Sequence, residues 1–280
     1  MERVETIAGV RSLLGRARSE GLTVGFVPTM GYLHEGHLTL IRKARESCGY
    51  VVASIFVNPT QFGPGEDYET YPRDPERDAA LAGEAGADVL FCPSVREMYP
   101  DGYATYVTVE GMTTKLCGVF RPTHFRGVAT VVAKLFNIVD PDLAFFGEKD
   151  YQQLLVVRRM AADLNMRVRV VGVPTVREAD GLAMSSRNVY LNQSERAAAV
   201  VLSRSLEAAR RAHAAGERRA AELSGLVRRM IEAEPLARVD YVEIYGLPDL
   251  TDIELVDGPA LLALAVRFGK TRLIDNTVLP

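Results

Sequence analysis

Residues 23–37 read TVGFVPTMGYLHEGH, and the predicted fold depends on this passage from a strand into a turn. TVGFV (23–27) is a short, nearly all-apolar run, which is typical of a parallel strand covered on both faces. The turn after it contains two glycines, Gly31 and Gly36, and two of the chain's four histidines, His34 and His37. Ligands of open α/β sheets bind beyond the carboxyl ends of strands, so this turn is a candidate binding site.

Four further apolar runs follow, separated by helix-like patterns. The runs are VVASIFV (51–57), DVLFC (88–92), LAFFG (143–147) and VRVVGV (168–173). The clearest helical pattern starts near Arg126 and repeats apolar residues at three- and four-residue spacing to Val139, and another runs from Tyr151 to about Asn165. This alternation predicts a Rossmann-like, doubly wound parallel sheet with right-handed crossovers.

The composition changes after about Val176. A polar, turn-rich stretch is followed by a long Ala/Arg/Glu segment, which Gly216 is predicted to break into two helices, with His213 on the surface. VDYVEIYG, ALLALAVRF and TRLIDN then suggest strands, the last two joined as a hairpin by FGKT. We therefore expect a first domain over residues 1–176 and a smaller α+β domain over residues 177–280.

Charge and cysteine content exclude several classes of protein. The net charge is −3, from 33 basic and 36 acidic residues, which gives no electrostatic footprint for nucleic acid. The three cysteines are odd in number and far apart, so a disulfide framework or structural zinc site is not expected. The N-terminal stretch predicts an amphipathic helix rather than a secretory signal, and no segment is apolar enough to span a membrane. We expect a soluble, cytoplasmic protein.

The histidine turn has the features of a phosphate site. A helix beginning near Gly36 would present free N–H groups and the positive end of its dipole. His34 and His37, three positions apart, can point to the same side of its first turn and donate hydrogen bonds to phosphate oxygens. The alternative is a loop in which both histidines only cap the helix or pack.

Two later turns contain charged groups that suit the same chemistry. In GEKD (147–150), Lys149 could stabilise charge on a transferring phosphorus, and Asp150 is predicted to cap the following helix. In MSSRN (184–188), two hydroxyls and a guanidinium could clamp phosphate oxygens. The alternatives are an ordinary helix-start loop and a polar linker. No Walker loop or GxGxxG fingerprint is present.

Other polar residues carry weaker signals. The amides of Gln61, in NPTQFG, and Gln153, in KDYQQ, suit the hydroxyl and carboxylate groups of a small substrate, although such residues more often lie on the surface. His124 is predicted to be a structural, hydrogen-bonded histidine. The segment QFGPGEDYETYPRDPERD (61–78) is predicted to be a surface loop.

These pieces together resemble a known family. His-x-Gly-His after the first strand, with MSSR late in the chain, is similar to the HIGH and KMSKS signatures of the nucleotidylyltransferase superfamily. Within it, seven segments occur in the order and spacing of the pantothenate synthetase (pantoate–β-alanine ligase) family, over essentially the whole chain. They are VPTMGYLHEGH, SIFVNPTQF, YPRD, HFRGV, FGEKDYQQL, GLAMSSRN and RLIDN.

The resemblance implies an ATP-dependent condensation of (R)-pantoate with β-alanine, giving pantothenate, AMP and pyrophosphate through a pantoyl adenylate. It also implies a homodimer, and Mg²⁺ carried by ATP rather than held in a protein cage. Another adenylate-forming enzyme of the superfamily is the main alternative. A tRNA-binding relative is disfavoured by the near-neutral charge and the short C-terminal domain.

The resemblance assigns site residues by their positions in the matching motifs. The implied ATP-binding residues are Met30, Gly31, Tyr32, Leu33, His34, Glu35, Gly36, His37, Gly147, Glu148, Lys149, Asp150, Val176, Met184, Ser185, Ser186 and Arg187. His37 is the implied proton donor, with His34 and Lys149 as further catalytic residues. Gln61 and Gln153 are the implied pantoate ligands.

Overall fold

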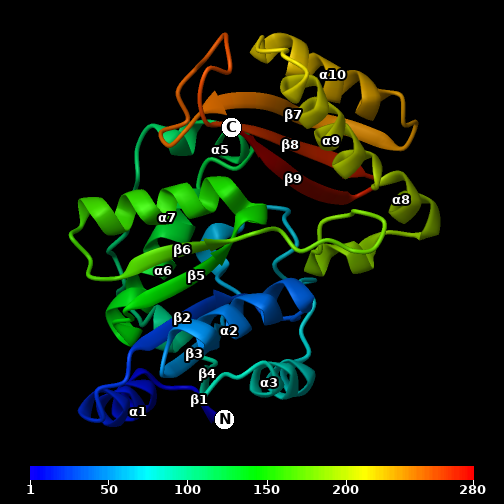
Figure 1. Cartoon of the computed structure of the whole chain (residues 1–280). Helices are drawn as coiled ribbons and strands as arrows, with labels where there is room; N and C mark the ends of the chain where they lie inside the picture. The colour runs from blue at the N-terminus through cyan, green and yellow to red at the C-terminus, as the bar shows by residue number, and fades with distance from the viewer.

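The first part of the chain forms a six-stranded parallel sheet in a computed structural model, which describes residues 1–280 (Figure 1). Its strands are β1 (Glu2–Val4), β2 (Val24–Thr29), β3 (Tyr50–Ile55), β4 (Val89–Phe91), β5 (Leu143–Gly147) and β6 (Arg169–Val173). The order across the sheet is β1-β4-β3-β2-β5-β6, and every neighbouring pair is parallel. The order reverses at β2, so the predicted Rossmann-like, doubly wound sheet is confirmed.

Helices cover both faces of this sheet, which explains why its strands are apolar without alternation. The helices of the first part are α1 (Ile7–Ser19), α2 (Glu35–Ser47), α3 (Pro75–Glu84), α4 (Val95–Met98), α5 (Cys117–Phe120), α6 (His124–Val139) and α7 (Tyr151–Asp163). Val52 packs in the core shared with α1, α6 and α7, whereas its neighbour Val51 packs in the core beneath α2 and α3. Successive strand residues therefore each meet an apolar layer.

Strand β1 was not predicted from the sequence. The sequence suggests only the amphipathic helix α1, but Glu2, Arg3 and Val4 pair in parallel with β4 before that helix begins. Three residues are too few to show a periodic pattern, and their polar side chains suit the exposed edge of a sheet.

The second part of the chain has an antiparallel sheet of its own. Strands β7 (Ala237–Gly246), β8 (Ala260–Phe268) and β9 (Thr271–Leu279) lie in that order. Helices α8 (Gln193–Ala198), α9 (Val201–Ala214) and α10 (Ala220–Glu232) lie beside the sheet, and α9 and α10 share a core with it (Figure 1). The predicted FGKT hairpin and the helix break at Gly216, where φ is +105°, are both confirmed.

His213 is buried, and its predicted surface position was wrong. Only 5% of the residue is exposed. It continues the buried stripe of α9 through Leu206 and Ala209, at three- and four-residue spacing. The surrounding Ala/Arg composition conceals this stripe, because alanine contributes little to the pattern.

The two parts of the chain meet through the free face of the antiparallel sheet. Tyr241, Leu261 and Ala263 belong to the same core as α6 and α7 of the first part. The second part of the chain therefore covers the carboxyl edge of the parallel sheet. None of the helices combines the length and apolarity needed to cross a membrane.

Candidate active site

Two adjoining cavities lie at this junction. The smaller has a volume of about 230 Å³ and the larger about 700 Å³. Most of the residues predicted to form the site line the smaller one, from all three candidate turns. They are Met30, His34, Gly36, His37, Gln61, Gly147, Lys149, Asp150, Gln153, Val176, Met184, Ser185, Ser186 and Arg187.

The other predicted ATP-binding residues lie outside the smaller cavity. Gly31 and Tyr32 line a separate hollow beside α3. The side chain of Leu33 belongs to the apolar core, with 1% of the residue exposed. The Glu35 carboxylate pairs with Arg42 on the surface of α2, and Glu148 faces neither cavity. These five residues were predicted only because they belong to motifs whose other members line the cavity.

The two histidines of the turn are held as neutral hydrogen-bond donors. His34 is the N-cap of α2, and its Nδ1 accepts the Gly36 N–H at 3.1 Å. The Nδ1 of His37 accepts the His34 N–H at 3.3 Å. With both Nδ1 atoms accepting, the ring proton of each lies on Nε2, free for a ligand. Burial and the nearby Lys149 charge lower the pKa of His34 to about 4, and burial beside His34 lowers the pKa of His37 well below its usual value.

A buried carboxylate orients the turn that precedes them. The two oxygens of Asp78, in α3, accept the N–H groups of Tyr32 at 2.6 Å and Leu33 at 2.7 Å. Tyr32 has a positive φ of 49°, a left-handed conformation that tyrosine rarely adopts. The two bonds to Asp78 stabilise it. Asp78 is the last residue of the predicted surface loop (61–78), and the structure places it in α3. No local pattern in the sequence distinguishes it from an acidic residue exposed to solvent.

Gln61 is fixed by a buried polar cluster. It ends the 3₁₀-helix η1 (Pro59–Gln61), and its side-chain oxygen accepts the Asn58 amide at 3.1 Å. Its own amide is directed at the sulfur of Met30, at the cavity wall. The carbonyl of Gln61 accepts the ring Nδ1–H of His124 at 3.0 Å. His124 is therefore hydrogen-bonded, as the sequence predicts, and it also lines both cavities.

The backbone of α6 approaches η1 so closely that only glycine fits at residue 127. A Cβ on Gly127 would lie 2.3 Å from the Thr60 carbonyl oxygen and 2.6 Å from the Gln61 Cα. Gly127→Ala is expected to lower the free energy of unfolding by about 1–3 kcal/mol and to displace Gln61. Chemical denaturation measures the loss, with Gly15→Ala in α1, where a Cβ meets nothing within 4 Å, as the matched control. Equal stability of the Gly127→Ala variant would contradict this packing.

Acidification is expected to weaken the fold through these histidines. Burial, with Arg121 beside it, lowers the pKa of His124 to about 4, as burial does for His34. An unfolded histidine protonates near pH 6.5, so below that pH the unfolded chain binds more protons, and the free energy of unfolding falls. The midpoint of thermal unfolding should fall progressively below about pH 6.5, and fall less in His124→Gln. Identical pH profiles for the two proteins would contradict this assignment.

The lysine turn follows β5, and β9 of the second part anchors it. The amide of Asn276 donates to the carbonyls of Glu148 at 3.0 Å and Lys149 at 2.8 Å. The Lys149 ammonium has only a 3.9 Å approach to the Asp150 carboxylate. Asp150 occupies the predicted N-cap position of α7, but its side chain makes no capping hydrogen bond, and the 3₁₀ turn η3 (Glu148–Asp150) precedes the helix.

The two glutamines that begin α7 have different surroundings. Gln153 lines both cavities, and its side chain makes no hydrogen bond within the protein. Gln152 is buried and bonds the backbone of Cys117, Met112 and Lys115, which fixes the loop before α5. A free amide at the cavity wall therefore distinguishes Gln153 as a ligand candidate.

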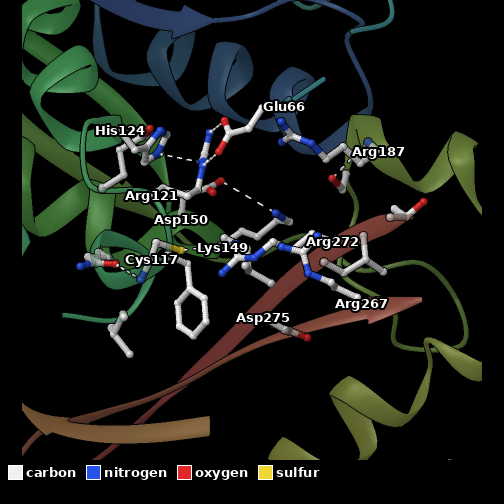
Figure 2. A pocket seen from close by; sticks show the side chains of 18 of the residues that line it. Glu66, Cys117, Arg121, His124, Lys149, Asp150, Arg187, Arg267, Arg272 and Asp275 are labelled. Atoms are coloured by element: carbon white, nitrogen blue, oxygen red, sulfur yellow. Dashed lines mark hydrogen bonds and ion pairs between the residues drawn. The ribbon is translucent and has the colours of Figure 1, made fainter. Parts of the chain in front are cut away.

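The serine–arginine turn is already paired with an acidic loop. Arg187, in η4 (Ser186–Tyr190), binds both oxygens of Asp67 at 2.8 and 2.9 Å. Arg121 binds Glu66 from the same loop, with Nε 2.7 Å from Oε1 (Figure 2). Both carboxylates come from the predicted surface loop, and the sequence gives no signal for either pairing.

The side chains around the smaller cavity indicate a class of enzyme. One cavity is surrounded by three groups of side chains. They are the two neutral imidazoles at the start of α2, Lys149 on the turn after β5, and the serines and arginine of residues 185–187. Such donors suit the stabilisation of charge on a transferring phosphoryl group. The free amide of Gln153 and the apolar wall of α6 leave room for a second, small substrate. This is an α/β enzyme built for nucleotide-dependent transfer.

Comparison with known proteins identifies the family. The family model described as pantoate-beta-alanine ligase matches residues 2–278. Pantothenate synthetase of Pelotomaculum thermopropionicum is 66% identical over 274 residues, 98% of this chain and 97% of that protein. The crystal structure of pantothenate synthetase from Thermus thermophilus has a TM-score of 0.94 and 54% identity, covering 99% of both chains. A Francisella tularensis pantoate-beta-alanine ligase, complexed with beta-gamma ATP and beta-alanine, has a TM-score of 0.81 and 33% identity, covering 99% of this chain and 97% of its own.

The chain belongs to the pantoate–β-alanine ligase family. It is an ATP-dependent ligase that condenses pantoate with β-alanine, as the resemblance implies.

Proposed function

We propose that the ligation proceeds through a pantoyl adenylate assembled in the smaller cavity. The pantoate carboxylate attacks the α-phosphorus of ATP, and the bond to pyrophosphate breaks. The β-alanine amine then attacks the acyl carbon and loses a proton, and AMP departs with the bonding electron pair. The supporting observation is that the stretches around residues 34, 149 and 186 meet at one cavity.

His34 and His37 act in this proposal as donors to phosphate oxygens. Negative charge grows on those oxygens as the α-phosphorus becomes five-coordinate, so a hydrogen bond strengthens in the transition state and lowers the barrier. Because their pKa values are lowered, the imidazoles are neutral at pH 7. This favours hydrogen-bond donation by His37 over transfer of a proton from it.

Lys149, Ser185, Ser186 and Arg187 hold the remaining phosphate oxygens. The Lys149 side chain is only 19% exposed, so its charge acts with little screening. Arg187 engages phosphate by exchanging its present partner, Asp67, for the nucleotide. A bidentate carboxylate and a phosphate present the same fork of oxygens to a guanidinium, so the exchange needs little reorientation.

Pantoate occupies the part of the cavity walled by α6. Gln61 and Gln153 bind its hydroxyl and carboxylate groups. The Gln153 amide makes no hydrogen bond within the protein, and the Gln61 amide has only the Met30 sulfur, a weak acceptor, to exchange for pantoate. Val131, Val132 and Leu135 line the same cavity and suit its paired methyl groups.

The nucleoside of ATP lies toward Gly147, Val176 and Met184. The Val176 carbonyl accepts the Met184 N–H at 3.0 Å, while the Val176 N–H has no partner and can serve adenine. No three His, Cys, Asp or Glu side chains gather into a metal site. In this proposal Mg²⁺ enters with ATP, held by its phosphate oxygens, the ligands that this ion prefers.

Three further features remain proposals. The boundary between residues 1–176 and 177–280 is supported by Leu182, which packs in the core of the second part. A homodimer is the state that the resemblance implies; residues 103–110, which join no sheet and expose Tyr106, are the candidate contact surface. A cytoplasmic location stays a prediction of the sequence.

Omission of each substrate in turn tests the proposed mechanism. AMP formation is measured with ATP, pantoate and β-alanine together, and then with one of them left out. Steady turnover should need all three, whereas one equivalent of pyrophosphate per site should appear without β-alanine. Pyrophosphate release that is independent of pantoate, or absent without β-alanine, would contradict the adenylate pathway.

A further inference from the structure

The larger cavity is lined by several basic side chains that have no role in the adenylation proposed above. Its cationic side chains are Arg121, Lys149, Arg187, Arg267, Lys270 and Arg272. The last three belong to β8, β9 and the hairpin between them, and none was a candidate from the sequence. Figure 2 shows Arg267 and Arg272 reaching toward the region of Lys149, with Arg187 at the opposite side.

The basic groups of the hairpin are incompletely neutralised. A single carboxylate, Asp240, pairs with both Arg267 at 3.1 Å and Arg272 at 2.7 Å. Lys270 makes no ion pair, and one terminal nitrogen of Arg272 is buried without any hydrogen-bond acceptor. One carboxylate faces two guanidinium groups and an ammonium, so the hairpin keeps a net positive charge that an anion in the cavity would balance.

The position of the cavity relative to the reacting atoms identifies the anion. Lys149, Ser185 and Arg187 line both cavities and so mark the boundary between them. Of the two proposed pantoate ligands, Gln61 lines only the smaller cavity, and Gln153 lies at the boundary with the larger one. Attacking and leaving oxygens lie roughly in line across a transferring phosphorus, so the leaving group departs on the side away from pantoate. The larger cavity is assigned to that side because Gln61 and the apolar α6 side chains proposed to hold pantoate line only the smaller one.

We infer that Arg267, Lys270 and Arg272 form a subsite for the pyrophosphate leaving group. This inference rests on the proposed adenylation. The ion moves from Lys149 and Arg187 onto the hairpin once its bond to the α-phosphorus is broken. A dianionic or more highly charged oxyanion fits this subsite, and a neutral ligand would leave its charges unbalanced.

Product inhibition tests the subsite. The double variant Arg267→Gln, Lys270→Gln removes two charges from the hairpin and leaves Arg272, which packs near Phe120 and Tyr241. Its inhibition constant for added inorganic pyrophosphate should rise roughly 3- to 30-fold, because each partly screened charge contributes a small factor. Its KM for ATP should change by less than about twofold on the same grounds. The control is Arg228→Gln, an exposed site on α10 that lines neither cavity.

Each outcome has one meaning. An unchanged inhibition constant, or an equal rise in the KM for ATP, would overturn the subsite, since these groups would then bind nothing or bind ATP before cleavage. Inorganic phosphate and sulfate are run in parallel and should inhibit more weakly than pyrophosphate; equal inhibition by sulfate would also overturn it. Failure of the adenylation proposal is recognised separately, as wild-type protein that releases no pantoate-dependent pyrophosphate.

Discussion

Replacing His37 by alanine is expected to slow formation of the adenylate about 100- to 1,000-fold, the usual cost of one lost donor to a developing charge. The imidazole presents its Nε2–H to the cavity, while its Nδ1 accepts the His34 N–H. Alanine removes both bonds, but the helix retains its His34 cap. The measurement is single-turnover release of pyrophosphate from ATP and pantoate, without β-alanine.

The control for this variant is Lys43→Ala, an exposed residue on the same helix. It should keep the wild-type rate. Circular dichroism should show both variants folded, because the lost bond at the helix start contributes only about 0.5–2 kcal/mol. A near-normal rate in His37→Ala would remove His37 from the mechanism.

Lys149→Ala should produce a loss of similar size, about 100- to 1,000-fold in the same assay. The ammonium lies on a turn whose carbonyls are bonded to Asn276, which fixes the turn at the cavity wall. Its position on both cavities predicts a second effect: inhibition by added pyrophosphate should weaken as well.

Lys149→Arg is the matched variant, since it keeps the charge and changes its shape. A partial recovery of rate is expected, because guanidinium and ammonium place their donors differently. Full activity in Lys149→Ala would show that the turn only shapes the cavity wall.

Much of the fold could be predicted because each buried strand leaves a local signal. The apolar runs 23–27, 51–57 and 143–147 correspond to β2, β3 and β5, and the turns after β2 and β5 contain His34, His37 and Lys149. Parallel strands bring the turns at their ends to one edge of the sheet, so the convergence of these residues follows from the strand assignment alone.

The partners of the site residues could not be predicted, because they come from distant segments. Asp67 and Asp78 lie in a stretch whose composition is that of a solvated loop, yet one binds Arg187 and the other binds the backbone before His34. In the sequence nothing distinguishes Arg272 from the other arginines. Its position at the cavity becomes apparent only in the structure, where it lies beside Cys117 and Phe120 of α5. Only the tertiary structure decides which charged groups are buried together.

The bonds from Asn276 to the carbonyls of Glu148 and Lys149 have a mechanical consequence. They couple Lys149, the proposed catalytic lysine, to the second part of the chain, most of whose core lies away from the cavities. Substitutions that loosen that core, such as Leu223→Ala on the buried face of α10, are expected to shift the ammonium without touching a substrate. Activity is therefore expected to respond to packing far from the cavities, in part through the amide side chain of Asn276.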